Sequence, residues 1–480
     1  MTKESSFWKS CPNCQGRGKK SQRIRKKARL AYQRALKEFK ESNHKEENAP
    51  LPPKGHLKIC DACSGSGLVS SNQFPVSDVE NLPHVAIVGG GIGGVALAVA
   101  CLHRGIPFTL FERDSNFNAR SQGYGLTLQQ ASKAMDGFGI RYLDQSITST
   151  RHVVHNIEGE ILGEWGMRKW VESQSKKAPK KTNIHIARQS LRLALLEQLG
   201  DEKSIKWNHQ FIDYNTDGES VHLNFLVNGK IKSTRADLIV GADGIRSGVR
   251  QKFLGEKIAP LRYLDCMVIL GICSLDSIEN IKSELLDSAT VFQTANGVER
   301  MYMMPYDGTS VMWQFSFPIA ESKAKIQSSH GAASLKNETL KRTQDWHDPI
   351  PQIIQATSTS LVSGYPVYDR ELLDKSAFAK AENLTLIGDA AHPMSPFKGQ
   401  GANQALLDAL SLARAISTGC RPQSNWKEIG IRKSALIPFE KEMLSRSASK
   451  VKDSAAAAQF LHSDVVLHEG DEPRGRVLKR

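Results

Sequence analysis

The chain has no apolar signal segment at its N-terminus, and its only long stretch without charge is residues 85–102. That stretch contains five glycines, whereas a membrane-spanning helix needs bulky apolar side chains, so no transmembrane segment is predicted. Cysteine is scarce, with eight in 480 residues, and four of these form C-x-x-C pairs. Such a pattern fits a metal site in a reducing compartment better than a disulfide framework, so we expect a cytoplasmic protein.

Acidic residues are outnumbered by basic ones, 50 against 64, which gives a net charge of +14. The excess is uneven, because residues 1–80 hold 16 Lys and Arg against 8 Asp and Glu. The remainder is only mildly basic, which suits an enzyme with anionic cofactors. At this length the chain can form two or three domains, and its composition is that of an ordinary globular protein.

Residues 85–112 read as a buried strand, a glycine turn, a helix over about 92–104, and a second strand that ends in an acid. Gly89, Gly91 and Gly94 have the G-x-G-x-x-G spacing, which allows a tight turn, close approach to a pyrophosphate and close packing of helix on strand. Glu112 follows at the separation expected of an acid that binds an adenosine ribose. The pattern predicts a dinucleotide site, with the phosphates at the helix N-terminus.

The first eighty residues contain two copies of C-x-x-C-x-G-x-G, beginning at Cys11 and Cys60. Two cysteine pairs can supply one tetrahedral zinc site, and the glycines allow backbone N–H groups to turn toward the sulfur atoms. The repeat resembles the zinc region of DnaJ-type chaperones. Because those chaperones carry four repeats and a His-Pro-Asp signature that is absent here, chaperone activity is not implied. The predicted zinc ligands are Cys11, Cys14, Cys60 and Cys63.

Between the two repeats, residues 19–47 are rich in Lys, Arg, Ala and Glu, with apolar residues at helical spacing. We expect a long basic helix followed by a proline-rich return. One interpretation is a solvated helix that zinc stabilises because the hairpin is too small to fold alone. The other is a docking surface for an anionic partner, such as nucleic acid or an acidic protein.

Two further strand-and-turn patterns follow, and the second opens a helix that runs to about Ser417. The first turn is Gly-Ala-Asp-Gly at 241–244, followed by arginines at 246 and 250. The second is Gly-Asp-Ala-Ala-His-Pro at 388–393, followed by Pro396 and by Gly-Gln-Gly-Ala-Asn at 399–403. Together with the dinucleotide turn, this order of motifs resembles the class A flavoprotein monooxygenases, the group of p-hydroxybenzoate and salicylate hydroxylases. The resemblance covers about residues 83–450.

The resemblance implies a set of residues around FAD. Those expected at the ADP half are Gly89, Gly91, Gly94 and Glu112, and Arg113 is also expected to bind the cofactor. Those expected at the pyrophosphate or flavin side are Arg120, Arg188 and Gln189. Asp243 and Gly244 match the turn used for both FAD and NAD(P)H, and Asp389 matches the acid that binds the ribityl chain. Those expected around the isoalloxazine ring are Pro396, Gly399, Gly401 and Asn403.

The resemblance also implies an α/β fold: a Rossmann-like FAD-binding domain of the glutathione reductase type with a mostly antiparallel substrate sheet. We expect a zinc hairpin over 1–75, a discontinuous FAD domain over 83–150, 180–255 and 376–460, and a substrate domain over 151–179 and 256–375. A tail over 461–480 would follow. Candidate strands of the substrate sheet span residues 263–273, 290–295, 300–305 and 310–318, and Met301, Met303, Trp313 and Phe315 either line the pocket or only pack the sheet.

In this family NAD(P)H reduces the flavin, and a C4a-hydroperoxide then transfers one oxygen atom of O2 to an electron-rich substrate. The implied cofactors are FAD, NAD(P)H with NADPH favoured, and Zn2+. Because the flavin carries the chemistry, no catalytic side chain is assigned; Pro396 would lie beside the flavin, and we interpret His392 as shaping its loop.

No acid or arginine stands out as a substrate anchor, so the substrate is not predicted beyond an aromatic or polycyclic small molecule, and neither is the oligomeric state. The loop that contains Asn403 and Asp408 resembles that of the tetracycline-inactivating monooxygenases, so a polycyclic substrate is a further possibility. A flavin-dependent halogenase is disfavoured because its W-x-W-x-I-P signature is absent. A zinc-anchored flavin redox sensor stays as the alternative from another class.

Overall fold

The computed structural model describes residues 7–41, 50, 53, 55–119, 123–172, 183–200, 204–278 and 281–474. At its centre is a five-stranded parallel sheet. Its strands, in spatial order, are β12 (Ile205–Lys206), β6 (Phe108–Phe111), β5 (Val85–Val88), β16 (Leu238–Gly241) and β22 (Leu384–Leu386). The expected α/β FAD-binding fold is confirmed.

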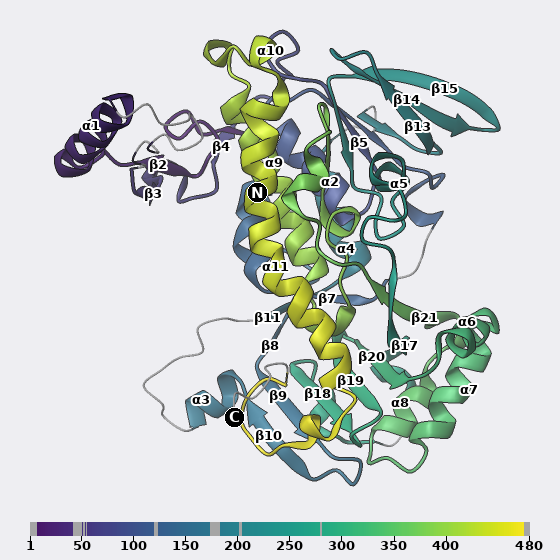
Figure 1. The fold of residues 1–480 in the computed structure, drawn as a ribbon. Helices are drawn as coiled ribbons and strands as arrows, with labels where there is room; N and C mark the ends of the chain where they lie inside the picture. Colours follow the sequence, from purple (N-terminus) through teal and green to yellow (C-terminus); the bar gives the residue numbers. More distant parts are fainter. Residues whose placement is uncertain are drawn as a thin grey trace.

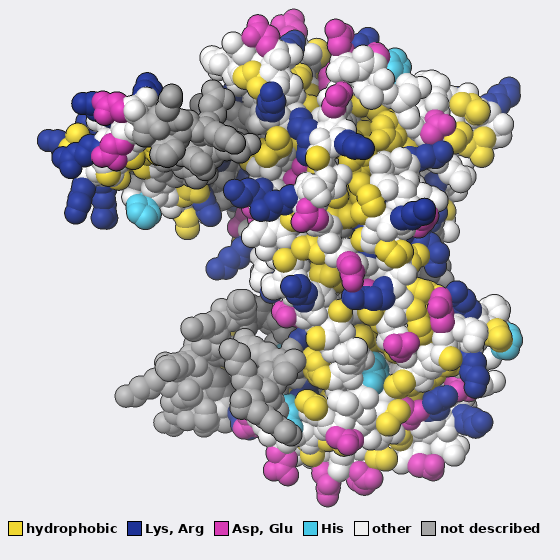
Figure 2. All heavy atoms as spheres, viewed as in Figure 1, with side chains coloured by type: hydrophobic (Ala, Val, Ile, Leu, Met, Phe, Trp, Pro, Cys, Tyr) yellow, Lys and Arg dark blue, Asp and Glu magenta, His cyan; other side chains and the backbone are white. Residues whose placement is uncertain are grey.

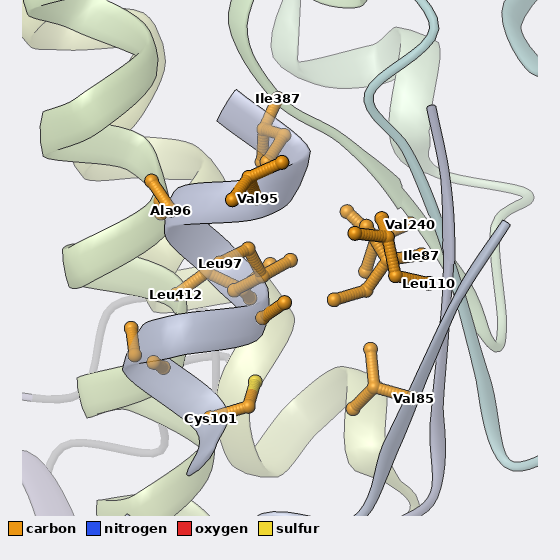
Figure 3. Close-up of a cluster of buried hydrophobic side chains, with 14 of the residues drawn as sticks. Val85, Ile87, Val95, Ala96, Leu97, Cys101, Leu110, Val240, Ile387 and Leu412 are labelled. Carbon is orange, nitrogen blue, oxygen red and sulfur yellow. The ribbon is translucent and has the colours of Figure 1, made fainter. Parts of the chain in front are cut away.

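One face of this sheet packs on α2 (Ile92–Leu102), which lies between the sheet and α9 (Gly401–Gly419), as Figure 3 shows. Ten of the eleven residues of α2 are buried, because the helix has packing partners on two sides. Its small alanine and glycine side chains allow this close packing. A three-stranded antiparallel sheet adds Leu223 and Phe225 to the same core, and consists of β13 (Gln210–Thr216), β14 (Val221–Val227) and β15 (Lys230–Ala236).

The second large sheet has seven strands and is antiparallel except where β9 pairs with β18. Its strands, in spatial order, are β10 (Ile161–Trp165), β9 (Arg151–His155), β18 (Thr290–Ala295), β19 (Arg300–Asp307), β20 (Ser310–Pro318), β17 (Arg262–Ser274) and β21 (Val362–Asp369). Three helices cover one of its faces: α6 (Glu321–Ser329), α7 (Gly331–Thr343) and α8 (Ile350–Ala356). The mostly antiparallel sheet is therefore as expected.

Several elements connect the two large sheets. A small sheet of β7 (Gly125–Leu128), β11 (Asn183–Ala187) and β8 (Ile147–Ser149) lies between them, and α4 (Arg188–Glu197) follows β11 directly. The long helix α11 (Ile437–Phe460) runs past both sheets (Figure 1). The remaining helices of the body are α3 (Met167–Glu172), α5 (Gly248–Leu254) and α10 (Trp426–Ile429). No helix among the described residues is long and apolar enough to cross a membrane.

The N-terminal module consists of two short ribbons and one helix. Strand β1 (Phe7–Ser10) pairs with β4 (Leu68–Ser71), and β2 (Lys19–Ser21) pairs with β3 (Leu57–Ile59). The helix α1 spans Lys26–Glu41; the last part of the helix predicted over 19–47 lies outside the described residues.

Candidate functional site

The predicted turns meet at one edge of the parallel sheet. Strands β5, β16 and β22 are neighbours, so the turns that follow them lie side by side at the carboxyl ends, where open α/β sheets bind ligands. A methyl group on Gly89 would come 2.6 Å from the carbonyl oxygen of Ala242, and one on Gly94 would come 1.8 Å from that of Gly89. Glycine is therefore required at both positions, the second for close packing of helix on strand, as predicted.

The N-terminus of α2 faces a positively charged space. Gly91 precedes the helix, and a methyl group on it would meet only Nη2 of Arg188, at 3.9 Å. The free N–H groups of the first helical turn, together with a guanidinium group, favour an anion with two phosphates. These residues fit the pyrophosphate of FAD.

Glu112 and Arg192 hold the dinucleotide turn in place. The two carboxylate oxygens of Glu112 accept hydrogen bonds from the backbone N–H groups of Gly90 (2.6 Å) and Asp114 (3.0 Å). Each oxygen keeps a lone pair that can accept from a ribose hydroxyl. The buried Arg192 donates from Nε to the carbonyl of Gly90 at 2.7 Å. The sequence analysis missed Arg192, although it lies one helical turn after Arg188, on the same side of α4.

Asp389 lies opposite this turn. Its side chain is exposed, whereas Gly388 and Ala390 on either side are buried. The surrounding protein raises its pKa, against the opposing charges of His392 and Arg188. A methyl group on Gly401 would lie 3.5 Å from Oδ1 of Asp389, and one on Gly399 would meet no atom within 4 Å. Asp389 therefore faces open space, where its carboxylate can accept hydrogen bonds from the ribityl hydroxyls.

A buried charge network supports the Asp389 turn. Oδ2 of Asp408 lies 2.7 Å from Nε2 of His392 and accepts from the backbone N–H of Gly388, while Oδ1 accepts from Nη2 of Arg446 at 2.8 Å. Burial by itself would lower the pKa of His392, but the Asp408 carboxylate outweighs it and the net shift is upward. His392 thus stabilises its loop from inside, as the sequence analysis proposed.

The Asp243–Gly244 turn lies against Gly89, but the Asp243 carboxylate points into its own helix. It accepts hydrogen bonds from the Ser247 hydroxyl and, at 3.2 Å, from the N–H of Val249 at the start of α5. The buried Arg250 donates from Nη1 to the carbonyl oxygens of Ala390 and Ala391. Asp243 therefore stabilises its own turn, and Arg250 connects this turn to the one that carries Asp389.

Both polar atoms of the Asn403 side chain form hydrogen bonds within the protein. Its Nδ2 donates to the carbonyl oxygens of Thr127 and Gly399, each at 2.8 Å, and its Oδ1 accepts from the N–H groups of Gln129 and Ala131. It thereby fixes the loop that carries Pro396 and the start of α9 against β7.

Three other residues were predicted to contact the cofactor. The Gln189 side chain lies near Gly123, 3.6 Å from the position that a methyl group on this glycine would take. Arg113 is exposed after β6, and Arg120 lies outside the described residues.

The seven-stranded sheet presents a mixed apolar and phenolic face to these turns. Met304, Met312 and Tyr306 share this face, and a methyl group on Gly125 of β7 would come 2.5 Å from Cε of Met304. Tyr365 is close to Tyr124 and Asp389, and burial together with these neighbours raises its pKa.

The four residues that were expected either to line the substrate pocket or only to pack the sheet lie on the opposite face of this sheet. They are Met301, Met303, Trp313 and Phe315, all completely buried in the core with α6, α7 and α8. The interpretation that they line the pocket was wrong, and the packing alternative holds. The side chains that face the cofactor turns come from the intervening positions of the same strands.

Arg300, which the sequence did not single out, lies on the cofactor-facing side of β19. It is 4% exposed, and its Nε and Nη2 both donate to Oε1 of Gln293, at 2.9 and 2.8 Å. Burial lowers its pKa to about 10, and no acidic side chain of the described residues pairs with it. A buried cation without an acidic partner is costly, so this arginine is suited to an anionic or strongly polar ligand.

A chain of hydrogen bonds begins at Thr127 of the small sheet, close to the Tyr302 side chain that lies beside Arg300. Oγ1 of Thr127 lies 3.1 Å from Nδ1 of His185. Oγ of Ser149 then lies 2.8 Å from Nε2 of His185 and 3.1 Å from Nε2 of His152. Burial lowers the pKa values of both histidines, to about 3 and about 4, so both are neutral near pH 7 and can pass a proton between their ring nitrogens.

The four N-terminal cysteines converge at a second site, where their sulfur atoms lie within 4.8 Å of one another. The N–H groups of Gly18 and Gly67 donate to Sγ of Cys14 (3.2 Å) and Cys63 (3.3 Å), as the repeat predicted. Four buried thiols with N–H donors fit Zn2+. The module also contacts the body: Arg414 of α9 donates to the carbonyl oxygens of Gly65 and Ser66.

Comparisons with known proteins agree with this geometry. A family described as FAD binding domain matches residues 83–425. The chain is 31% identical over 345 residues to aurachin C monooxygenase/isomerase of Stigmatella aurantiaca, which covers 69% of this chain and 80% of that protein. Zeaxanthin epoxidase of Oryza sativa subsp. japonica is 25% identical over 76% of this chain, which spans about half (53%) of that longer protein.

Among solved structures, HpxO of Klebsiella pneumoniae, complexed with FAD and uric acid, has the same fold. Its TM-score is 0.65 at 19% identity, over 80% of this chain and 90% of that one. The family match covers more than half of the chain, and the cradle at the sheet edge fits the cofactor that the family binds. The chain therefore belongs to the FAD-binding-domain family of FAD-dependent monooxygenases.

Proposed function

We propose that the protein uses NAD(P)H, with NADPH favoured, and O2 to hydroxylate an aromatic or polycyclic small molecule. The carrying observation is the phenolic and apolar sheet face that lies against the cofactor turns and holds the buried Arg300. When bound, the flavin accepts a hydride and activates O2, so the protein needs no nucleophile of its own. The protein's part is to orient the substrate and exclude water.

Arg300 gives this substrate a chemical character. A phenolate, enolate or carboxylate oxygen would satisfy the guanidinium, while Met304, Met312 and Tyr365 would pack on the ring. The ring centroid of Tyr302 lies 5.1 Å from the guanidinium carbon of Arg300. The Tyr302 hydroxyl would take up the proton that such a substrate loses while its own proton leaves toward Thr127. Thr127, His185, Ser149 and His152 would then pass a proton outward along the bonded chain.

We further propose that Gly89, Gly91, Glu112, Arg188 and Asp389 contact FAD directly, and that Gly94, Asp243, Arg250 and Asn403 position the turns around it. The same proposal assigns Zn2+ to the four N-terminal cysteines and keeps the predicted domain boundaries. A cytoplasmic location is supported by the eight cysteines, none of which is paired in a disulfide.

The experiment that tests this function is anaerobic reduction of the bound flavin by NADPH, which is measured as the loss of flavin absorbance. Phenols, aromatic acids, quinones and tetracyclines are each added in turn. We expect one class of compound to accelerate the reduction and then to gain one oxygen atom in air. A flavin-loaded protein that consumes NADPH without oxygenating any acidic aromatic compound would contradict the proposed substrate class. Failure to bind FAD at all would overturn the whole assignment.

A further inference from the structure

The N-terminal module carries a segment that the monooxygenase function does not explain. We call it the basic arm: residues 19–41 and 55–59, which form β2, α1 and β3. Figure 1 shows α1 at the edge of the molecule, connected to the body through the β2–β3 ribbon. No residue of α1 is buried, so this helix does not contribute to a described core.

The charge of the arm is strongly one-sided. Residues 19–41 contain ten Lys and Arg but only two acidic residues. Where the structure describes the arm, its ion pairs are Lys37 with Glu41 (3.8 Å) and Lys58 with Asp61 (3.2 Å), so most of its cations have no acidic neighbour there. Figure 2 shows these cations gathered around α1. Such a surface attracts an anionic partner, and the attraction weakens with added salt.

The arm also exposes large aliphatic side chains. Leu57 and Ile59 lie two residues apart on β3 and therefore on the same side of the ribbon, and they are 64% and 58% exposed. Their cross-strand neighbours on β2 are Ser21 and Lys19. Leu30 of α1 is 41% exposed. A module that only needed to be solvated would gain nothing from these residues, since each exposed aliphatic group costs free energy in water.

This combination of charge and exposed aliphatic side chains disfavours nucleic acid as the partner. Nucleic acid offers phosphates but no apolar layer that could cover Leu57 and Ile59. An anionic phospholipid surface offers both, because its headgroups attract Lys and Arg while the headgroup and acyl boundary accepts aliphatic side chains. We propose that the basic arm docks the protein onto an anionic membrane surface. This inference does not depend on the proposed function.

The cysteine site gives the arm a defined orientation. Cys60 follows Ile59 directly, and the N–H of Cys60 donates to the carbonyl oxygen of Gly18, next to Lys19. The start of β2 and the end of β3 are therefore both fixed at the four-cysteine cluster. The cluster is in turn held on the body through Arg414, so docking the arm would also orient the FAD-binding domain relative to the membrane.

The test is co-sedimentation of the full-length, FAD-loaded and zinc-loaded protein with phospholipid vesicles at near-physiological salt. Phosphatidylcholine vesicles are compared with vesicles that also contain about 30% phosphatidylglycerol. We expect binding to the anionic vesicles and at least tenfold weaker binding to the neutral ones. A charge variant, Lys26→Gln with Lys27→Gln, Arg34→Gln and Lys37→Gln, and an apolar variant, Leu57→Ser with Ile59→Ser, should each lose binding by at least tenfold.

The matched control is Ile231→Ser with Ile326→Ser, which removes two exposed isoleucines (69% and 56%) far from the arm and should bind like the wild type. Flavin and zinc contents verify that each variant is folded. Absence of binding to anionic vesicles, or equal binding to neutral ones, overturns the proposal. So does an apolar variant that binds normally while the charge variant loses affinity for single-stranded RNA, since that result would identify nucleic acid as the partner.

Discussion

Nε2 of His392 lies 2.7 Å from Oδ2 of Asp408, and neither side chain is exposed to solvent. The same carboxyl group accepts from Gly388 and Arg446, so one buried anion connects the loop of Asp389 to α9 and α11. This arrangement places a fully buried charge pair behind the turn that carries Asp389. Asp389 itself stays free to face the cofactor.

Replacing Asp408 by alanine should therefore destabilise the protein. The change leaves His392, Arg446 and the Gly388 N–H without their buried acceptor, and breaking such a pair typically costs about 3–5 kcal/mol. Urea unfolding followed by circular dichroism measures the change. Asp453→Ala, at an exposed position of α11, is the control and should have little effect. Similar unfolding midpoints for both variants would refute the supporting role.

Asp389→Ala should weaken FAD binding without unfolding the protein. Its carboxylate faces open space, and hydrogen bonds to a charged group contribute about 1.5–3 kcal/mol, which corresponds to roughly a 10- to 150-fold rise in the dissociation constant. Titration of apoprotein with FAD, monitored by flavin fluorescence, gives this constant. Glu382→Ala removes an exposed acid nearby in sequence as a comparison. Unchanged affinity in Asp389→Ala would remove this residue from the cofactor site.

Two adjacent glycines of α2 offer a matched pair. A methyl group on Gly94 would lie 1.8 Å from the carbonyl oxygen of Gly89, whereas one on Gly93 would meet its nearest atom, Cβ of Ala405, at 3.4 Å. Gly94→Ala should thus cost at least about 1–3 kcal/mol and reduce flavin content, because the turn must shift. Gly93→Ala should be tolerated. Thermal unfolding and flavin-to-protein ratios compare the two, and equal behaviour would argue against the close packing at Gly94.

Arg300→Met should abolish the acceleration of flavin reduction by the substrate. Methionine keeps much of the side-chain volume but removes the charge, so an anionic substrate should bind at least tenfold more weakly while FAD content stays normal. Substrate titrations of the reduction rate give the change. Arg235→Met, at an exposed arginine of β15, is the control. A variant that binds the substrate as well as wild type would exclude Arg300 as its anchor.

Cys60→Ser should remove the metal. Wild-type protein is expected to contain one zinc ion per chain, and the variant far less, because serine does not supply a thiolate. Cys273→Ser alters a buried cysteine of the seven-stranded sheet and should keep the zinc. Elemental analysis of both proteins decides the matter; a full complement of zinc in Cys60→Ser would contradict a site of four cysteine ligands.

Local spacing explains what could be predicted from the sequence. The G-x-G-x-x-G turn and the C-x-x-C-x-G-x-G repeats each encode a compact geometry within a few residues, and the structure has both. Arg300 could not be found in this way, because its significance comes from burial on one face of a sheet without an acidic neighbour. The wrong interpretation of Met301 and Trp313 has a similar cause. Both faces of β19 and β20 are buried, so alternation does not reveal which face meets the cofactor.

The order of strands in the parallel sheet has a consequence for synthesis of the protein. β22 and Asp389 complete the cofactor cradle, yet they follow β5 by about 300 residues, and all seven strands of the second large sheet are encoded between them. At ribosomal rates of about 5–20 residues per second, roughly 15–60 s separate these two strands. The dinucleotide turn therefore leaves the ribosome long before its partners. Until β22 is made, the nascent chain must keep a four-stranded sheet, with an unpaired edge at β16, from aggregating.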